Sequence, residues 1–425
     1  MARWPPGFTM LPIPSGPLSP AGAVNAVSAD GKTAVGYATA DTTTSALYHQ
    51  ACYWTPTSGP VFIAPVGTTA WDVSQDGSVI VGGPDVTGGT PTIVTPFYWT
   101  ASGGVVPFGA STDSVNAISA DGSRVVGNGA SGACYWNVST LAQTFLPLPT
   151  GFSGSSAIDV SADGSVIVGQ MTPTGGGPTH LYRWTSATGM VDLGLPVGVM
   201  PGTGARMAGC SDDGNTLVGG ISDTGEGSFI WTPTSFVEIP NTAIYGFVAV
   251  SGDGSTVYGS GWYPDVTHDH GDHIAYMVNG HAVTPTPTLF PPSTNEPSTH
   301  YLSANNGISR DGLVMGGYCE DTIVTGVPSV LRPFIYVAPG LAMDNVMIGT
   351  GDCVLCLDWS DDRGHTFGVP VCQPMSSSGF LTSLQWQRLG YARDRLFRLT
   401  WTCAEPTALQ GAWYTAIAER RRGKK

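Results

Sequence analysis

A short His- and Asp-rich stretch is the densest group of potential metal ligands in the chain. It reads His268-Asp269-His270-Gly271-Asp272-His273 and contains three of the eight histidines. Imidazole and carboxylate groups suit zinc, nickel or copper. The candidate ligands are therefore His268, His270, Asp272 and His273. The stretch lies in a predicted loop between Trp262 and a strand at Ala275, where an exposed polar turn is the commoner outcome.

The cysteines favour packing over chemistry. Eight cysteines in 425 residues do not form the dense pattern of a disulfide framework. Cys353 and Cys356 have the spacing of a zinc knuckle, but positions i and i+3 of an extended strand face opposite sides. The intervening Val354-Leu355 also lacks the glycine of a knuckle turn, so we expect buried thiols. Cys52 and Cys134 each precede a Tyr-Trp pair, and we predict that they are small buried hydrophobes.

A second polar pattern has the form of an Asp box, a turn found in propeller hairpins. Its residues are Ser360, Asp362, Gly364 and Thr366. An acidic side chain that folds back onto backbone N–H groups, with a glycine to relieve the turn, makes this a structural motif. Sialidase chemistry would also need several convergent arginines. Those of residues 1–350 lie at unrelated positions: Arg3, Arg124, Arg183, Arg206, Arg310 and Arg332. We predict no enzymatic activity and no cofactor.

Charge is unevenly distributed along the chain. Residues 1–350 contain seven Lys and Arg but 24 Asp and Glu, a net charge of −17, whereas residues 351–425 carry +3. Affinity for nucleic acid comes mainly from Lys and Arg, so we do not expect sequence-specific DNA binding by the long acidic segment. No apolar run approaches the roughly 18 residues needed to span a bilayer, and the first residues lack the apolar core of a secretion signal.

A repeat organises most of the chain. Asp-Gly pairs followed by small β-branched residues and a glycine begin at residues 30, 76, 121, 163, 213, 253 and 311, with gaps of 40 to 58 residues. Asp-Gly between two apolar runs predicts a hairpin. Two further strands follow in each unit, the first of them aromatic, as in Leu181-Tyr182-Arg183-Trp184. Units of four strands and this length predict an all-β fold, a β-propeller.

The first residues resemble the second half of a unit. Residues 2–12 align with residues 182–193, so we expect an N-terminal half-blade that is completed by strands from the end of the repeat region. Such closure removes exposed sheet edges. Seven Asp-Gly units favour seven blades, with six or eight as alternatives. The predicted boundaries are residues 1–340 for the propeller, 341–416 for a β-rich C-terminal region and 417–425 for a basic tail.

The repeats resemble the bacterial HAF-type extracellular repeat, which has the pattern Ile-Ser-x-Asp-Gly-x-x-Val-x-Gly followed by an aromatic Trp-Thr strand. The resemblance covers residues 1 to about 340. It implies a propeller and leaves the activity open, because a fold does not determine a function.

The C-terminal region resembles the tail hub or nozzle proteins of short-tailed bacteriophages, the packaged-DNA stabilisation family. The matching stretches are residues 359–367 and 388–397, followed by Pro406 and Gly411-Ala412. The resemblance implies a homo-oligomeric ring, expected to be a hexamer. It would be assembled in the host cytoplasm, lie in the virion below the portal adaptor (the head-to-tail connector), and contact a tail fibre or spike. Genome DNA would pass through its exit channel without sequence-specific binding.

Arg388, Arg393, Asp394 and Arg395 are the candidate assembly contacts of this region. An arginine fork that meets a carboxylate on another subunit would explain them. An exposed face of alternating charge would explain them equally well. Two other functions remain as alternatives to the nozzle. One is a bacterial HAF-repeat propeller that acts as a binding or surface module, and the other is a glycan-cleaving propeller enzyme.

Overall fold

The computed structural model describes residues 4–5, 7–14, 21–39, 49–85, 93, 95–195, 204–222, 227–239, 246–262, 272–278, 281–283, 300–321, 330–337, 353–360, 371–375 and 396–402. Every regular element in these ranges is a β-strand. The same ranges contain no helix of the length and hydrophobicity that a membrane crossing requires. The chain divides into two compact units, Met1–Pro339 and Gly340–Lys425.

The first four sheets of the first unit each contain four antiparallel strands in chain order. Their strands are β2 (Gly22–Val27), β3 (Ala34–Thr39), β4 (His49–Thr55) and β5 (Ser58–Val66); β6 (Thr68–Val73), β7 (Val79–Pro84), β8 (Phe97–Thr100) and β9 (Gly104–Pro107); β10 (Ser114–Ile118), β11 (Arg124–Gly129), β12 (Gly132–Asn137) and β13 (Gln143–Phe145); and β14 (Phe152–Val160), β15 (Val166–Pro173), β16 (His180–Thr185) and β17 (Gly189–Gly194).

Three more four-stranded sheets follow, so that the described part of this unit contains seven. Their strands are β18 (Gly204–Cys210), β19 (Leu217–Ser222), β20 (Gly227–Thr232) and β21 (Ser235–Ile239); β22 (Gly246–Val250), β23 (Thr256–Trp262), β24 (Asp272–Val278) and β25 (His281–Val283); and β26 (His300–Ile308), β27 (Val314–Asp321) and β28 (Val330–Val337) with β1 (Gly7–Met10). We number these sheets one to seven in this order.

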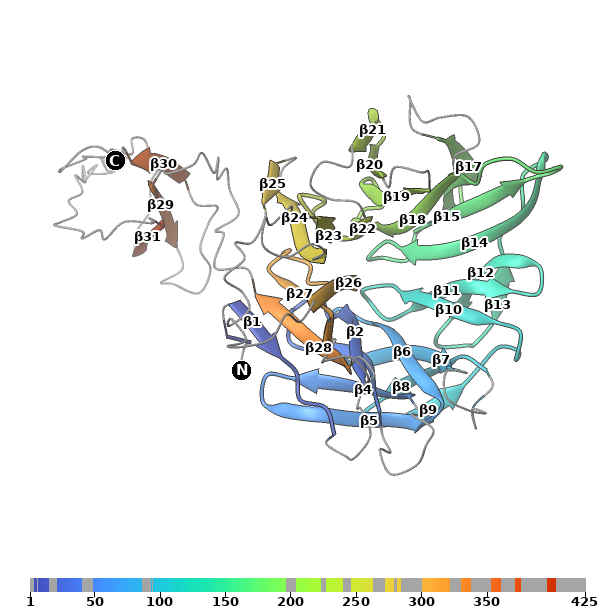
Figure 1. Ribbon diagram of the computed structural model, residues 1–425. Coiled ribbons are helices and arrows are strands. Elements are labelled where there is room, and N and C mark those ends of the chain that lie inside the picture. The colour runs from blue at the N-terminus through green and yellow to red at the C-terminus, as the bar shows by residue number, and fades with distance from the viewer. Residues whose placement is uncertain are drawn as a thin grey trace, which may run out of the picture. The chain divides into compact units, whose positions relative to one another are not determined.

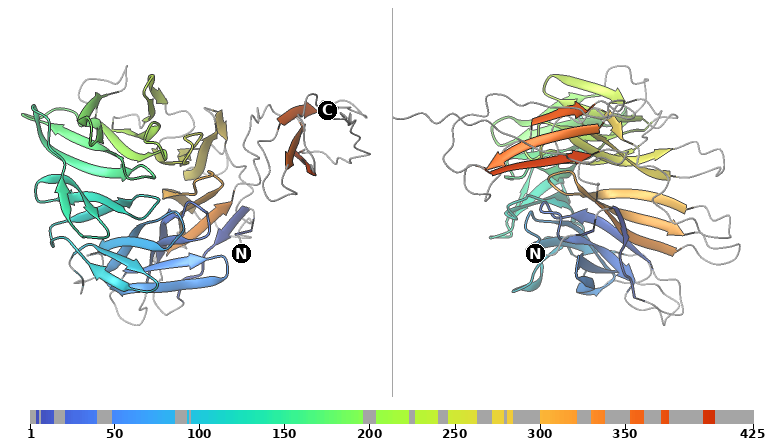
Figure 2. Two further views of the ribbon diagram at one scale, coloured as in Figure 1. Left: turned by 180° about the vertical axis from the view of Figure 1, so that it is seen from behind. Right: turned by 90° about the vertical axis from the view of Figure 1, so that its left-hand side faces the viewer.

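The seven sheets are arranged around a common axis (Figures 1 and 2). The first strand of each sheet lies nearest the axis and contacts the first strand of the next sheet, from β2 to β6 and onward to β26. β26, β27 and β28 in turn contact β2, which closes the ring. The all-β fold and the propeller class predicted from the repeat are confirmed.

The ring is also closed by strand pairing. β1 pairs with β28 antiparallel over four residues, from Gly7 opposite Val337 to Met10 opposite Phe334. The N-terminal strand therefore supplies the outer strand of sheet seven, as the half-blade alignment predicted. Trp4 and Leu11 flank this strand and are buried in a cluster with Trp54. Burial of such apolar area is the main stabilising contribution to the closure.

Aromatic side chains of the third strands fill the space between sheets. Trp54, Trp136 and Phe229 are at most 1% exposed. One cluster joins Ala117 and Val126 of sheet three to side chains of sheet four. Large rings bury much area at each contact, so the predicted packing role of the aromatic strand is confirmed. Cys52 and Cys134 are buried free thiols, also as predicted, and burial raises the pKa of Cys134 to about 11.

A close backbone approach accounts for the glycine that ends the repeat motif. Each of the seven first strands contains a β-bulge, a local change of register. The first strand passes so near the second that a Cβ on Gly169 would lie 1.9 Å from Ser156 O, and one on Gly219 would lie 2.0 Å from Arg206 O. Only a residue without a Cβ fits there.

The second unit contains a three-stranded sheet in the order β30-β29-β31. β29 (Cys353–Ser360) pairs with β30 (Val371–Met375) and with β31 (Leu396–Thr402). β29 includes Cys353 and Cys356, which were expected on an extended strand.

Candidate functional site

The turn after each first strand is built by a buried serine and the aspartate of the Asp-Gly pair. In sheet four, Ser161 Oγ donates to Asp163 Oδ1 (2.8 Å) and accepts from Val166 N–H (2.9 Å). Asp163 Oδ1 also accepts from Ser165 N–H (2.9 Å), and this bond lowers the pKa of that carboxyl. Gly164 has a φ of 72°, which favours glycine, and donates to Ser161 O. Four hydrogen bonds within the turn therefore hold its shape.

All seven turns repeat the serine-to-aspartate bond. The other six join Ser28 to Asp30, Ser74 to Asp76, Ser119 to Asp121, Ser211 to Asp213, Ser251 to Asp253, and Ser309 to Asp311, at 2.6 to 3.0 Å. The seven serines are at most 1% exposed. Because each serine hydroxyl and one oxygen of each aspartate are engaged inside the turn, we interpret the repeated residues as scaffold.

Backbone hydrogen bonds link the seven turns into a closed circle. The donors and acceptors are Asp30 N to Gln75 O, Gln75 N to Ala120 O, Asp121 N to Ala162 O, Ala162 N to Asp212 O, Asp212 N to Gly252 O, Gly252 N to Arg310 O, and Arg310 N to Ala29 O. The N···O distances are 2.9 to 3.3 Å. This circle joins every sheet to the next at one end of the axis, and we call that end the turn end.

Arg310 extends across the turn end. Its Nε forms an ion pair with Asp212 of sheet five, and its Nη1 donates to Gln75 Oε1 of sheet two at 3.3 Å. Gly252 lies between the two charged residues in the circle, and a Cβ there would lie 2.5 Å from Arg310 Cγ. Burial raises the pKa of Asp212 more than the guanidinium lowers it. Arg310 thus ties sheet seven to two sheets that are not its neighbours.

Two half-buried carboxylates tie neighbouring first strands together. Asp72 Oδ2 accepts from Ile118 N–H, and Asp159 Oδ2 accepts from Cys210 N–H, both at 2.8 Å. Burial raises the pKa of Asp72 to about 7 and that of Asp159 to about 6, although the backbone bonds favour the ionised forms. The charge of Asp159 raises the pKa of Asp72 further. Both carboxyl groups therefore have pKa values near neutral pH, and each bonds its sheet to the backbone of the next sheet.

Asparagine side chains also bond to the backbone of the following sheet in sheets one and three. Asn25 Nδ2 donates to Ala70 O (2.8 Å), and Asn116 Nδ2 donates to Ala157 O (2.6 Å). Each of sheets one to four is therefore bonded through a side chain of its first strand to the backbone of the following sheet: an asparagine in sheets one and three, and an aspartate one position later in sheets two and four.

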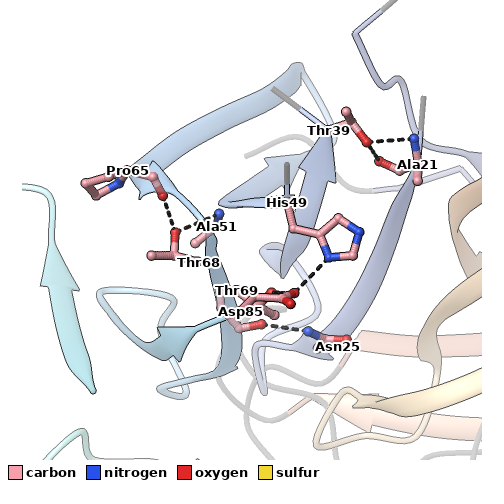
Figure 3. A network of polar contacts seen from close by, with 10 residues as sticks. Ala21, Asn25, Thr39, His49, Ala51, Pro65, Thr68, Thr69 and Asp85 are labelled. Atoms are coloured by element: carbon pink, nitrogen blue, oxygen red, sulfur yellow. Dashed lines mark hydrogen bonds and ion pairs between the residues drawn. The ribbon is translucent and has the colours of Figure 1, made fainter. Parts of the chain in front are cut away.

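A different polar network lies between sheets one and two at the opposite end of the axis (Figure 3). His49 Nδ1 lies 2.7 Å from Asp85 Oδ2, and Thr69 Oγ1 donates to the same oxygen at 2.8 Å. Both side chains of the His–Asp pair are 13% exposed. Tyr37 stacks on the imidazole with ring centroids 3.9 Å apart. Burial, with smaller contributions from Tyr318 and Asp85, raises the pKa of Tyr37 to about 12.

This network has the arrangement of a positioned imidazole. A carboxylate that accepts from Nδ1 sets the tautomer and leaves Nε2 as an acceptor. Such a nitrogen can accept a hydrogen bond from a ligand hydroxyl. His49 and Asp85 are 36 residues apart, and no motif connects them, so reasoning from the sequence missed this network. The sequence feature that could have revealed the network is a departure from the repeat, because the other units lack a histidine at the position of His49.

Three of the arginines considered above contact separate turns. Arg124 Nη1 donates to Gly164 O, Arg183 Nε donates to Gly214 O (2.9 Å), and Arg310 pairs with Asp212. Each guanidinium fastens one sheet to another. In the part of the chain that the structure describes, these three do not converge on one point, as carboxylate recognition by a sialidase requires.

Most of the site residues predicted from the sequence lie outside the described residues. These are His268, His270, Asp362, Gly364, Thr366, Arg388, Arg393, Asp394 and Arg395. Ser360 ends β29, and Asp272 and His273 begin β24. Within the described ranges, no group of three or more His, Cys, Asp or Glu side chains is arranged to hold a metal ion.

The sequence matches no protein-family model and no curated protein. Solved structures with a similar fold include the β-propeller domain of the Trilobed protease from Pyrococcus furiosus, which has an open velcro topology. It is 9% identical over 75% of this chain and 95% of that one, with a TM-score of 0.51. Oligogalacturonate lyase from Vibrio parahaemolyticus is 10% identical over 78% of this chain and 97% of that one, with a TM-score of 0.50. At these identities the likeness shows the propeller fold alone.

Proposed function

We propose that the chain is a structural protein of a virus particle, the nozzle or hub ring in the tail of a short-tailed bacteriophage. The observation that carries this proposal is the pair of sequence stretches at residues 359–367 and 388–397, which resemble that family. The ring would attach below the portal adaptor and hold a tail fibre or spike. It would form part of the DNA exit channel.

The propeller supports the proposal as a rigid scaffold. We propose that its seven sheets are seven blades, closed by β1 and by the circle of backbone bonds at the turn end. The repeated polar side chains bond within the fold, and this suits a structural role. The independent compact unit Gly340–Lys425 contains the family-like stretches, so assembly contacts would belong to it.

The charge supports the same role. Residues 1–350 carry a net charge of −17, and the affinity of a protein for DNA phosphates comes mainly from Lys and Arg. DNA could therefore pass along an acidic surface without being bound tightly by it. Electron microscopy of the purified chain tests this reading. We expect sixfold rings, and a ring whose lumen is strongly positive would overturn it.

Charge reversal tests the assembly contacts. The double variant Arg393→Glu/Arg395→Glu should abolish ring formation, because each guanidinium would be replaced by a carboxylate at a contact between subunits. The double variant Arg420→Glu/Arg421→Glu, in the basic tail, is the matched control and should leave the rings intact. Rings that survive the double reversal would contradict the contact.

A binding module of the bacterial HAF-repeat type is the second candidate. The polar network of His49, Asp85 and Thr69 favours it, because these residues are not part of the repeat. Gene context separates the two: neighbouring genes for portal, terminase and tail proteins favour the nozzle. A secretion signal encoded upstream favours the surface module.

A further inference from the structure

The contact of His49 with Asp85 distinguishes one joint of the ring from the others. His49 begins β4 of sheet one, and Asp85 follows β7 of sheet two. The other six units have no histidine at the position of His49. At the position of Asp85, eleven residues after the turn serine, they have Thr39, Ala130, Thr172, Ser222, Trp262 and Glu320. The joints between the other sheets therefore form without this pair, and the fold does not require it.

Backbone hydrogen bonds hold the two residues in place. Gly67 is the single residue between β5 of sheet one and β6 of sheet two. Its N–H donates to His49 O (2.7 Å), and its carbonyl accepts from Asp85 N–H (2.8 Å). The side chains of His49 and Asp85 also meet, with Nδ1 2.7 Å from Oδ2. Because the backbone already positions both residues, the side-chain contact costs less conformational entropy than a pair of long side chains at the surface.

The charge on the imidazole determines the strength of this contact. A protonated imidazole is attracted by the carboxylate of Asp85 and by the aromatic face of Tyr37, whose ring centroid lies 3.9 Å away. Both side chains of the His–Asp pair are only 13% exposed, so water screens the attraction incompletely. A neutral imidazole can still donate from Nδ1 to the carboxylate. Loss of the proton therefore removes a charge–charge attraction across the joint and leaves a hydrogen bond.

The groups that face the imidazole come from several elements. Asp85 follows β7, Tyr37 lies in β3, and Thr69 of β6 donates to Asp85 Oδ2 at 2.8 Å. Burial, more than the nearby Tyr318 of β27 and Asp85, raises the pKa of Tyr37 to about 12, so its phenol is neutral near pH 7. Imidazole is the side chain whose charge ordinarily changes between about pH 5 and 8, so His49 is the group of this network to test in that range.

We propose that His49 and Asp85 form a pH-sensitive contact that strengthens the joint between sheets one and two while the imidazole is protonated. The stabilisation is complete below the pKa of a histidine in an unfolded chain, about 6.5, and is lost as rising pH removes the proton in the folded chain. At the turn end, the same two sheets are joined by a backbone bond from Asp30 N to Gln75 O, which does not titrate. Rising pH should therefore weaken the joint at one end only. This contact does not depend on the nozzle proposal.

A double-mutant cycle at two pH values tests the proposal. The chains are the wild type, His49→Asn, Asp85→Asn and the double variant, and the asparagine at position 49 keeps a neutral N–H donor in place of Nδ1. Urea denaturation at about pH 5.5 and about pH 8.5 gives the folded-to-unfolded ratio of each chain. The cycle cancels the titration of Asp72 and Asp159, which all four chains share. We expect the coupling factor to be about tenfold larger at the lower pH.

His180 and Asp192 provide the matched control. His180 Nδ1 lies 3.0 Å from both carboxylate oxygens of Asp192, but the two residues belong to adjacent strands of one sheet. Their side chains are 27% and 38% exposed, and water screens such a pair. The same cycle with asparagine at both positions should give a coupling factor that changes less than about twofold between the two pH values.

Hydrogen exchange of the wild-type chain locates the effect without any variant. After correction for the intrinsic exchange rate at each pH, protection of the Gly67 and Asp85 N–H groups should fall about tenfold from the lower to the higher pH, relative to the Gln75 N–H at the turn end. Three results would overturn the proposal: a His49–Asp85 coupling that does not decrease with pH, a decrease no larger than that of the control pair, or equal changes in protection at the two ends.

Discussion

Adjacent glycines in one strand allow a direct test of how closely the first and second strands approach. Gly219 and Gly220 both lie in β19, and neither has a positive φ. A Cβ on Gly219 would lie 2.0 Å from Arg206 O and 2.7 Å from Phe229 Cε1. A Cβ on Gly220 would have no neighbour nearer than Gly227 O, at 3.9 Å. The two positions therefore differ mainly in the space available to a methyl group.

The expected change in the free energy of unfolding follows from the space available to that methyl group. Real Cβ contacts are essentially never shorter than 3.0 Å, so Gly219→Ala must move the carbonyl of Arg206 by about 1 Å. This displacement strains the β18–β19 pairing and the fully buried ring of Phe229, and we expect it to lower the free energy of unfolding by about 2–4 kcal/mol. Gly220→Ala should be neutral or raise it by up to about 1 kcal/mol, because alanine reduces the entropy of the unfolded chain.

Urea denaturation followed by tryptophan fluorescence measures both variants against the wild type. The midpoint should fall clearly for Gly219→Ala and remain unchanged or rise for Gly220→Ala, with similar slopes. Equal midpoints for the two variants would refute the close approach as the reason for the glycine. Gly169→Ala in sheet four provides a second test, since its Cβ would lie 1.9 Å from Ser156 O.

Three further predictions concern the polar ties between sheets. Because burial raises the pKa of Asp72 to about 7, the folded chain binds that proton more tightly than the unfolded chain, and stability should fall as pH rises from about 4 to about 7. Asp72→Asn should reduce this dependence of stability on pH, measured by denaturation curves across the same pH range, whatever its effect on absolute stability. An unchanged pH dependence would contradict the raised pKa of Asp72. Arg310→Ala should cost about 1 kcal/mol, since its guanidinium is partly exposed, and a double-mutant cycle with Asp212→Asn should show coupling between them. Ser161→Ala leaves the buried Val166 N–H without its acceptor and should cost about 1–3 kcal/mol by thermal or urea melts; a loss no larger than that of the exposed Ser139→Ala would argue against it.

Local patterns were sufficient to predict the architecture. An Asp-Gly pair between apolar runs specifies a hairpin through residues that are neighbours in the sequence, as at Asp163-Gly164. The resemblance of residues 2–12 to the second half of a unit predicted the partner of the first strand, because an incomplete sheet leaves an edge to be paired. Both inferences use information contained within one repeat or in the comparison of two.

The contacts between sheets could not be predicted in the same way. Asp72 bonds to the N–H of Ile118, 46 residues away, and His49 bonds to Asp85, 36 residues away. Which side chain meets which depends on the twist and spacing of neighbouring sheets, not on any local spacing. The invariant glycine was visible in the sequence, but its cause was not, since the carbonyl it admits belongs to the preceding strand.

Positions that depart from the repeat are where recognition should be sought. At the turn end, the circle of backbone hydrogen bonds and the Arg310 side chain hold the sheets together. At the opposite end, Tyr37 and Tyr318 of two neighbouring sheets stand where the other five sheets have glycine, serine or an amide residue, so the fold does not require an aromatic ring there. The network of His49, Asp85 and Thr69, with Tyr37 stacked on the imidazole, therefore makes the end opposite the turns the one at which a ligand should be sought, whether the propeller belongs to a virion or to a bacterial surface.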